Sequence, residues 1–404
     1  MRQKHIAIFI DSKKRSGGAY QELMYTIKNF KKYNDKYKIS IIFSEKNLDI
    51  NLTKFDLSSF NLNLNNFQRY VCFLRNNNSL IRRLKKFFFF KNYFEKFIKS
   101  KKIDLIYFAG PSQYASFLEN TKYVITVPDV NHRENLEFPE IVDDSEFERK
   151  EEIFLRCLSK AILIVTNAKI IKERICYFYR VLEDRVVVVN HEPSLSISNF
   201  TNFDKKKMEK IKNELSLPTN YLFYPAMYLP HKNHKNLFKA LDIIKNKNKI
   251  LNLVCCGNDI GYLKSLKNYV KSKKLEDQIL FLDFIKDEHL PYLYNNCSML
   301  VMTSLIGPTN IPPWEAFRLK KPVIYPNLEG IKEVLGDAVL YIDPLNPENI
   351  AKGILEITEN KNLSEQLIKK GNEKIQEIIN KEEFKEKIIK AIDNYFNIQT
   401  LLEK

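Results

Sequence analysis

The sequence predicts an α/β protein with two doubly wound domains, each a parallel sheet covered by helices on both faces, with a cleft between them. Short apolar runs alternate with helical stretches, which is typical of parallel strands that are buried on both faces. The alternation stops near residue 193 and then starts again. The length of 404 residues allows about two to three domains, and 44% hydrophobic against 28% charged residues is an ordinary globular balance.

The first half contains the strands expected for the first domain. They are His5–Ile10, Ile39–Phe43, Asp104–Ala109, Tyr123–Val127, Ile162–Thr166 and Val186–Asn190. A glycine pair, Gly17 and Gly18, follows the first strand and precedes a helical stretch. Thr53–Asn66 is rich in Asn and Ser and is expected to be a surface loop or an irregular excursion. Pro193–Leu217 lacks a strand signal and is expected to be a linker with a lead-in helix.

A second series of strands follows in the other half. They are Tyr221–Pro225, Leu251–Cys256, Ile279–Leu282, Met299–Thr303, Val323–Tyr325 and Val339–Ile342. Helices are expected from Lys235 and from Pro313, since proline suits the first helical turn. We therefore expect a first domain over residues 1–200 and a second over 201–385. A C-terminal helix over 386–404 is expected to pack back on the first domain.

Composition narrows the classes of function. No apolar run approaches the roughly 18 residues needed to cross a bilayer, and Ile6–Ile10 is too short for the apolar part of a signal peptide. Six cysteines without a CxxC pair are expected to be reduced core residues in a cytoplasm. With 65 basic and 49 acidic residues the net charge is +16, which indicates a polyanion nearby: nucleic acid, an anionic membrane or a phosphate-rich substrate.

Two stretches of the first half follow strands and are candidates for binding or catalysis. Gly17 and Gly18 would let backbone N–H groups approach an anion beside a helix N-terminus, although a tight turn alone would also explain them. Val127–Arg133 ends a strand with polar side chains. There, His132 could donate to a sugar hydroxyl or a phosphate and Asp129 could orient it, the alternative being a histidine in an ordinary surface loop.

Two stretches of the second half also follow strands and are candidates for binding or catalysis. Tyr224–Asn236 brings lysines and histidines to a strand–helix turn, where a lysine suits a diphosphate; a solvated basic loop is the alternative. Thr303–Phe317 runs through a Gly/Pro-stiffened loop into a helix whose first turn carries Glu315. Free N–H groups there favour a phosphate, and Glu315 suits two adjacent ribose hydroxyls. The only tryptophan, Trp314, is expected to be a core residue.

These last two stretches resemble a known family. PAMYLPHKNHKNL and GPTNIPPWEAFRLKKPVIYPNLEGIKEVLGDAVLYIDP are similar to the group-1 glycosyltransferases, in particular to the bacterial branch that builds surface polysaccharide such as lipopolysaccharide or capsule. The resemblance is strong over residues 221–360, and in the first half it depends on Gly17, Gly18 and the loop from Asp129 to His132. It implies two facing Rossmann-like domains, the GT-B fold, and retaining transfer from a nucleotide sugar.

Position by position, the resemblance implies roles for residues of this chain. Lys232 matches the lysine that neutralises the donor diphosphate, and Glu315 matches the acid that binds the nucleotide ribose. Gly307 stands where the family has a first acid, so the donor sugar is expected to be held by backbone amides of the loop that follows. That loop consists of Pro308, Thr309, Asn310 and Ile311.

Two further departures concern charge and catalysis. Met227 stands where many relatives have an arginine beside the diphosphate. Pro128 stands where a histidine often precedes Asp129, which leaves His132 as the expected catalytic histidine beside Asp129 and Lys232. The chain has no DxD motif, which fits a transferase that needs neither a metal nor a cofactor.

Half of the excess charge is concentrated in Ile81–Lys102, which has nine basic residues and one acid. At helical spacing one face of this segment is apolar; it consists of Leu84, Phe87, Phe90, Phe94, Phe97 and Ile98. Phe89 falls on the basic side, and phenylalanine among lysines suits an anionic bilayer surface. Arg82–Lys102 could thus touch the inner face of the plasma membrane; an ordinary covering helix with a solvated basic face and a nucleic-acid-binding segment are the alternatives.

The expected partners are a nucleoside-diphosphate sugar and a glycan or lipid-linked acceptor, with no nucleic acid. A basic nucleic-acid-binding protein would explain the charge, but no recognition motif accompanies it. A catalytically inactive transferase homologue that acts as a binding or scaffold partner would explain Gly307, Met227 and Pro128. A sugar-nucleotide epimerase would share the fold, and the loop from Gly307 to Phe317 fits it less well.

Overall fold

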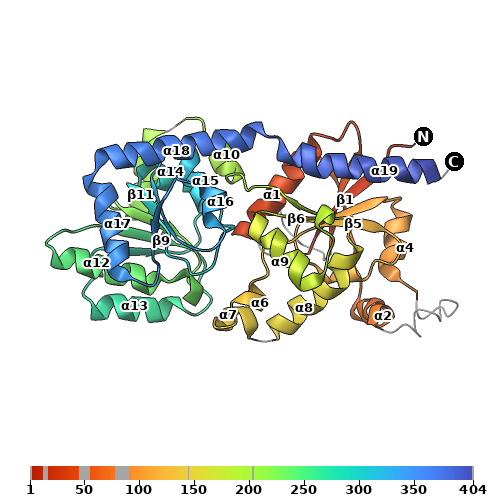
Figure 1. Cartoon of the computed structure of the whole chain (residues 1–404), viewed down its shortest axis with the longest axis horizontal. Helices are drawn as coiled ribbons and strands as arrows, with labels where there is room; N and C mark the ends of the chain where they lie inside the picture. Colours follow the sequence, from red (N-terminus) through yellow and green to blue (C-terminus); the bar gives the residue numbers. More distant parts are fainter. Residues whose placement is uncertain are drawn as a thin grey trace. The chain divides into compact units, whose positions relative to one another are not determined.

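The computed structural model of the chain describes residues 2–11, 17–44, 55–77, 91–143, 145–202 and 204–402 (Figure 1). The chain divides into two compact units. Unit 1 comprises Met1–Glu134, Val142–Val189 and Glu383–Lys404, and unit 2 comprises Asn135–Ile141 and Asn190–Glu382. No helix in the described part of the chain is both long and apolar enough to cross a membrane.

Unit 1 is built on a parallel sheet. Its strands, as far as the chain is described, have the order β3-β2-β1-β4-β5-β6-β7. They are β1 (His5–Ile10), β2 (Lys38–Phe43), β3 (Ser58–Asn61), β4 (Leu105–Phe108), β5 (Lys122–Thr126), β6 (Leu163–Thr166) and β7 (Val186–Val188). All six residues of β1 are buried, as expected for a central strand that helices cover on both faces.

Helices connect the strands of unit 1. The longer ones are α1 (Gly18–Lys31), α2 (Asn66–Asn77), α4 (Tyr93–Ser100), α8 (Glu146–Cys157) and α9 (Lys169–Tyr179), and the single turns are α5 (Gln113–Ser116) and α6 (Asn131–Glu134). The core between helices and sheet is aromatic: the ring of Phe9 lies 5.5 Å from Phe94, 5.1 Å from Phe108 and 5.0 Å from Tyr114.

The C-terminal segment packs on unit 1. Phe384, in the π-helical turn Phe384–Ile389, contacts Tyr25 and Phe30 of α1 edge-on, with ring centroids 6.0 and 5.1 Å apart. Further along, Asp393 of α19 (Lys390–Leu402) accepts hydrogen bonds from Lys36 and Tyr37. Aromatic packing and these polar contacts therefore hold the end of the chain against the first sheet's helices.

Unit 2 repeats the architecture. The strand order of its sheet within the described residues is β10-β9-β8-β11-β12-β13, again all parallel. The strands are β8 (Leu222–Pro225), β9 (Leu253–Cys256), β10 (Ile279–Leu282), β11 (Met299–Val301), β12 (Val323–Pro326) and β13 (Leu340–Ile342). This is the order of a doubly wound mononucleotide-binding sheet.

The helices of unit 2 form two groups (Figure 1). One group consists of α12 (His234–Asn246), α13 (Leu263–Ser272) and α17 (Pro347–Glu359), in which α12 contacts both of the others. The other consists of α10 (Leu195–Ser198), α14 (Leu290–Asn296), α15 (Pro312–Arg318) and α18 (Lys361–Asn380). Two further helices are α11 (Lys205–Glu214) and α16 (Ile331–Leu335).

Three predictions about the organisation need correction. Residues 190–200 were expected in the first domain but belong to unit 2, because α10 packs against α14 and α15. The segment Asn135–Ile141, which includes most of α7 (Pro139–Val142), also belongs to unit 2. Within Thr53–Asn66, predicted to be irregular, Ser58–Asn61 forms an edge strand whose backbone pairs with β2.

The six cysteines are free thiols, and all except Cys176 are buried. Burial raises the pKa of the Cys157 thiol to about 12, so this thiol stays protonated at neutral pH. The expectation of unlinked, mostly core cysteines is therefore met.

A close backbone approach next to β9 leads to a first prediction. A Cβ atom at Gly257 would lie 2.3 Å from the carbonyl oxygen of Ala226, so Gly257→Ala must push the loop after β8 away from β9. We expect a loss of about 3 kcal/mol of unfolding free energy, measured in urea, because overpacking against backbone is poorly relieved. Gly110→Ala is the matched control, since nothing lies within 4 Å of its Cβ position. Equal stability of the two variants would contradict the prediction.

Candidate functional site

Two loops of unit 2 leave the sheet at the point where its strand order reverses. The chain runs outward from β8 to β9 and β10, then returns to β11 on the other side of β8. The pairing of Leu222 with Met299 and of Phe223 with Leu300 places the carboxyl ends of β8 and β11 side by side. In open α/β sheets ligands bind outside the carboxyl ends of the strands at such a switch point.

Hydrogen bonds join these two loops. The N–H of Leu305 donates to the carbonyl of His231 at 2.7 Å, and the side-chain amide of Asn233 donates to the carbonyl of Thr303 at 3.0 Å. The hydroxyl of Thr303 in turn donates to the carbonyl of Asn233 at 3.2 Å. The stretches Tyr224–Asn236 and Thr303–Phe317, identified separately in the sequence, therefore form one structure.

Lys232 lies in this junction, at the end of the 3-10 turn Pro230–Lys232. Its carbonyl accepts a hydrogen bond from the hydroxyl of Tyr224 at 2.7 Å, and the side chain is half-buried. The next residue, Asn233, has a φ of 57°, a left-handed conformation that asparagine tolerates. This turn fixes the backbone of Lys232 immediately before α12 begins.

His234, the first residue of α12, is fully buried and lies against two tyrosine rings. The ring centroids of Tyr224 and Tyr228 are 4.8 and 5.4 Å away, and neither imidazole nitrogen has a hydrogen-bond partner among the described residues. Burial, with a smaller effect of the Lys232 charge, lowers the pKa of His234 to about 3. The imidazole is therefore neutral at pH 7 and adds no charge to the site.

Glu315 lies inside unit 2 rather than on an open surface. It is 4% exposed, and its carboxylate accepts a hydrogen bond from the hydroxyl of Tyr294 at 2.7 Å. Burial raises the pKa of Glu315, although hydrogen bonds from Ser194 and Tyr294 oppose the rise. To bind ribose hydroxyls, Glu315 would have to exchange one of these partners, so this role stays a prediction.

The loop between β11 and α15 contains the expected donor-sugar residues. Pro308 and Ile311 are buried, while Gly307, Thr309 and Asn310 are half-buried. The sequence led us to expect that Pro308–Ile311 hold the donor sugar through backbone N–H groups. Since proline has no N–H, Thr309, Asn310 and Ile311 are the three of these four residues that could donate such a hydrogen bond.

The position of the missing acid is filled by neighbouring side chains. A Cβ atom at Gly307 would lie 3.2 Å from a methyl carbon of Leu328 and 3.3 Å from the hydroxyl oxygen of Tyr325. Any larger side chain would require both neighbours to move. Gly307 is therefore fitted to this packing, which gives the departure from the family pattern a physical reason.

In unit 1 the predicted residues are less exposed than the sequence suggested. His132 is completely buried; its Nε2 lies 2.9 Å from the Tyr179 hydroxyl and 3.3 Å from a carboxylate oxygen of Glu151. Burial lowers the pKa of His132. Asp129 is half-buried and accepts the N–H of Asn131 at 3.1 Å. The catalytic roles of His132 and Asp129 stay predictions, and His132 would have to leave this cluster to reach a substrate.

The glycine pair lies at the start of α1. Gly17 is exposed with a φ of 82°, a left-handed conformation that favours glycine, and Gly18 is the first helical residue. Two polar residues that the sequence reasoning missed lie at the adjoining switch point: Ser112, after β4, donates a hydrogen bond at 2.6 Å to Asp11, which follows β1. Their position after two neighbouring central strands was the signal that could have identified them.

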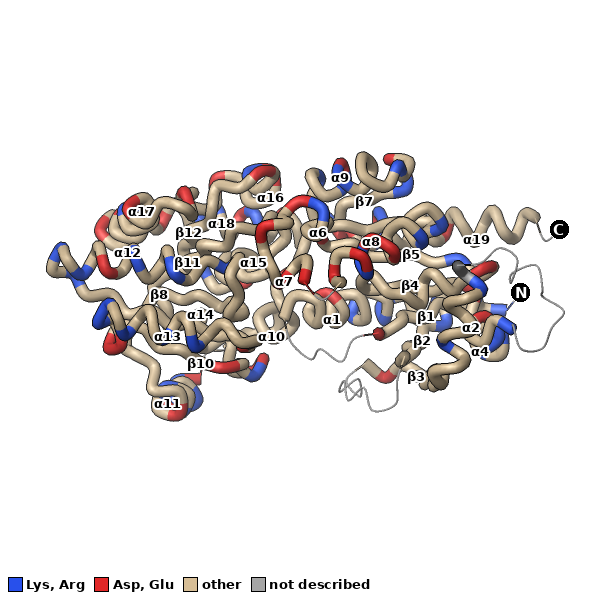
Figure 2. Tube along the Cα trace, turned by 90° about the horizontal axis from the view of Figure 1, so that it is seen from below, with Lys and Arg blue, Asp and Glu red and all other residues tan. Residues whose placement is uncertain are grey.

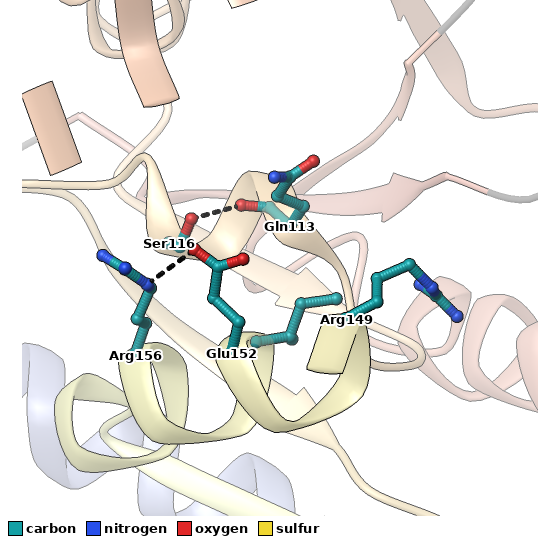
Figure 3. Close-up of a pocket in the computed structure, with 6 residues that line it drawn as sticks. Gln113, Ser116, Arg149, Glu152 and Arg156 are labelled. Carbon is teal, nitrogen blue, oxygen red and sulfur yellow. Dashed lines mark hydrogen bonds and ion pairs between the residues drawn. The ribbon is translucent and has the colours of Figure 1, made fainter. Parts of the chain in front are cut away.

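A small pocket of unit 1 lies between α5 and α8 (Figure 3). It is lined by Gln113, Ser116, Arg149, Glu152, Ile153 and Arg156. Arg156 pairs with Glu152 at 3.0 Å, and the Ser116 hydroxyl donates to the carbonyl of Gln113 at 2.7 Å. Its volume of about 20 Å³ suits a single water molecule rather than a sugar ring. Among the described residues, no cluster of three or more His, Cys, Asp or Glu side chains is arranged to hold a metal ion.

Comparison with known proteins identifies the domain that carries the loop junction. Residues 205–374 match the family described as glycosyl transferases group 1. Unit 2 is a group-1 glycosyltransferase domain. The resemblance noted in the sequence is thereby confirmed.

Relatives of this group-1 domain include bacterial O-antigen enzymes. The chain is 27% identical over 182 residues to the O-antigen chain mannosyltransferase RfbU of Salmonella typhimurium, which covers 43% of the chain and 51% of RfbU. It is 23% identical over 211 residues to the serotype-specific mannosyltransferase WbdA of Escherichia coli, 52% of the chain and 24% of WbdA. The match thus spans about half or less of these relatives.

Solved structures establish the fold of the whole chain. The crystal structure of Anabaena HepE in complex with UDP and glucose matches with a TM-score of 0.65 and 16% identity, and the match covers 100% of both chains. A glycosyltransferase from Rickettsia africae matches with a TM-score of 0.68 and 18% identity over 96% of this chain and 99% of that one. The chain therefore has the GT-B fold, a pair of α/β domains with parallel sheets, as the resemblance implied.

The buried His234 generates a prediction about acid stability. In the unfolded chain an imidazole with its ordinary pKa of 6.5 takes up a proton as the pH falls, whereas the buried ring does not until about pH 3. Stability is therefore lost as the pH falls from about 6.5 towards 3, by at most about 1.4 kcal/mol per pH unit. His234→Phe should flatten this loss in urea unfolding measured from pH 7 to 4. It should also leave the stability at pH 7 unchanged or raise it by about 1 kcal/mol, because unpaired ring nitrogens are removed.

His289→Gln is the control for this measurement, since His289 is only half-buried and lies 3.7 Å from Glu288. Parallel stability curves for His234→Phe and the unsubstituted chain would show that His234 does not carry the effect.

Proposed function

We propose that the chain is a retaining glycosyltransferase that moves a sugar from a nucleoside-diphosphate sugar to a glycan or lipid-linked acceptor in the synthesis of bacterial surface polysaccharide. The observation that carries the proposal is the hydrogen-bonded junction of the β8 and β11 loops, with Lys232 in it, at the switch point of a group-1 glycosyltransferase domain. The naming of RfbU and WbdA as mannosyltransferases makes mannose the first donor sugar to test.

The chemistry needs a cation where the leaving diphosphate gains charge. Lys232 is the lysine of this junction, and an ammonium group there stabilises the departing phosphate without a metal. In the proposed step the bond from the anomeric carbon to the diphosphate oxygen breaks, and a bond from that carbon to the acceptor oxygen forms on the same face. The acceptor proton passes to the leaving diphosphate, so the anomeric configuration is retained.

The test uses the purified full chain. A thermal-shift screen with UDP- and GDP-sugars should identify the donor, because a ligand that binds only the folded state raises its melting temperature. Release of the nucleoside diphosphate should then require an acceptor extract and should persist in EDTA. The anomeric proton of the product, observed by NMR, reports whether the configuration is retained. A chain that binds none of these donors would contradict the proposed function.

A catalytically inactive homologue that binds or scaffolds partners is the second candidate. It is favoured by the tight packing around Gly307, where a side chain would require Leu328 and Tyr325 to move, and by Met227 and Pro128, where the family resemblance implies basic side chains. It predicts donor binding in the thermal-shift screen without release of nucleoside diphosphate from any donor.

We also propose that the chain works at the cytoplasmic face of the membrane and touches anionic lipid. Much of Arg82–Lys102 lies outside the described residues. Of its described part, Phe94 and Ile98 on α4 are buried while Lys96, Lys99 and Lys101 are exposed. Figure 2 shows basic positions, in blue, around α4. Two exposed aromatic side chains, Phe67 and Tyr70, lie on α2, which contacts α4. Exposed aromatic rings beside lysines suit the headgroup region of a bilayer.

Lys232→Ala should lower the transfer rate at least about 100-fold, because it removes the cation that faces the leaving group. Lys239→Ala is the matched control: this lysine also lies on the β8–α12 segment, but it is exposed and its ammonium donates only to Asn236 at 3.1 Å. The measurement is the initial rate of nucleoside-diphosphate release with the donor found in the screen. Full activity of Lys232→Ala would show that the diphosphate is neutralised elsewhere.

Replacing Lys96, Lys99 and Lys101 by Glu should weaken binding to vesicles with 30% phosphatidylserine at least about tenfold, since each surface lysine contributes about 1 kcal/mol near such a membrane. The control carries three matched replacements on α13, at Lys264, Lys267 and Lys271, all exposed. Co-sedimentation with the vesicles measures both. An equal loss in the two variants would mean that overall charge, and not the α2–α4 surface, causes binding.

A further inference from the structure

Glu140 and His231 form a close pair within unit 2. One carboxylate oxygen of Glu140, Oε1, lies 2.6 Å from Nδ1 of His231 and also accepts the backbone N–H of His231 at 3.0 Å. The two side chains are largely shielded from solvent, with exposed fractions of 10% for Glu140 and 13% for His231. The second carboxylate oxygen, Oε2, is buried and has no hydrogen-bond partner among the described residues.

The protonation state of Glu140 makes this second oxygen an acceptor. Burial acts to raise the pKa of Glu140, but the hydrogen bonds from His231 and from the backbone of Glu140, together with the charge of His231, hold the pKa below its ordinary value. The carboxyl group is therefore ionised at neutral pH and can only accept hydrogen bonds. Burying an anionic oxygen without a hydrogen-bond donor costs folding free energy. A ligand group that donates a hydrogen bond to Oε2 would remove this cost, which is the physical explanation we adopt for the unpaired oxygen.

The pair is joined to the loop that lacks an acid. The carbonyl of His231 accepts the N–H of Leu305 at 2.7 Å, and Leu305 is only two positions before Gly307. At Gly307 itself, Tyr325 and Leu328 occupy the space that a side chain would need. Glu140 thus brings a carboxylate to the β8–β11 junction from a different segment of the chain.

We propose that Glu140 binds the donor sugar: Oε1 holds His231, and Oε2 accepts a hydrogen bond from a hydroxyl of the sugar. Glu140 would in this way provide the carboxylate that is absent at Gly307. A neutral, hydroxyl-bearing sugar is the ligand class that fits, because a phosphate oxygen would be repelled by the carboxylate. This inference rests on the proposed function, since it requires a sugar nucleotide bound at the junction.

The test compares a sugar nucleotide with its nucleoside diphosphate on Glu140→Gln. Glutamine keeps the shape and can still accept from His231 through its carbonyl oxygen, but it presents an NH2 group in place of Oε2. Calorimetry compares GDP-mannose with GDP and UDP-glucose with UDP. For the sugar nucleotide that the unsubstituted chain prefers, we expect Glu140→Gln to bind at least about tenfold more weakly. This factor corresponds to the loss of one hydrogen bond to a charged group. The affinity for the nucleoside diphosphate should stay within about twofold.

Glu137→Gln is the matched control, because Glu137 lies in the same segment and is exposed; both affinities should remain unchanged. An equal loss for the sugar nucleotide and the nucleoside diphosphate on Glu140→Gln would overturn the inference, because Glu140 would then act only through His231 and the loops. Unchanged binding of both would overturn it as well. Failure of the unsubstituted chain to bind any of the four compounds would overturn the proposed function, and this inference with it.

Deoxy sugars provide a second measurement that does not depend on one variant. Removing the hydroxyl that meets Oε2 should weaken binding to the unsubstituted chain about tenfold and have no effect on Glu140→Gln. Should Glu140→Gln not fold, Glu140→Asp, which keeps the charge but withdraws the oxygens, takes its place in the same series. Equal effects of every deoxy sugar on both proteins would overturn the inference.

Discussion

The parallel pairing of β8 with β11 determines where the rest of the candidate site lies. Both strands are buried in the middle of their sheet, so the loops that leave them start side by side. Backbone groups at that point are shielded from water and must be satisfied by each other, as the bonds from Leu305 to His231 and from Asn233 to Thr303 show. Each such bond adds only about 1 kcal/mol net, but leaving its partners unpaired would cost more. The loops are therefore ordered before a ligand arrives, which lowers the entropy that binding must offset.

The same packing explains why position 307 is a glycine. Tyr325 lies in β12, the strand next to β11 in the sheet, and its hydroxyl oxygen would be 3.3 Å from a Cβ atom at residue 307. An acid at 307 would need this ring and Leu328 to retreat, and it would place a negative charge in a poorly solvated loop. A carboxylate brought by Glu140 already has two N–H donors from His231. The charge is thus located where the surrounding backbone can stabilise it.

The strands could be predicted because a strand buried on both faces is a continuous apolar run, as in His5–Ile10 and Leu253–Cys256. Ser58–Asn61 escaped prediction because an edge strand depends on backbone pairing with β2 and needs no apolar pattern. The junction of the β8 and β11 loops could be anticipated in part, since both motifs follow strands. The role of Glu140 could not be anticipated, because nothing in its local sequence indicates that it contacts His231, 91 positions away. The burial of His132 escaped for a similar reason, since Phe154 and Tyr179 come from other helices.

Within unit 2, Lys232 is the cation to which we assign a role at the junction in the proposed function. His234 is close to Lys232 in the sequence, but it adds only a neutral ring, because burial holds its pKa near 3. Lys321, another half-buried lysine of unit 2, binds the backbone: burial lowers its pKa, and its ammonium donates to the carbonyls of Asn295 and Cys297 at 2.7 and 2.9 Å. Such a lysine satisfies backbone oxygens and is engaged by the fold. Lys232 is half-buried as well; it lies at the end of a short turn, and its carbonyl accepts a hydrogen bond from the hydroxyl of Tyr224. A lysine whose backbone is fixed in this way suits the diphosphate of the proposed function, because the position of the residue is constrained.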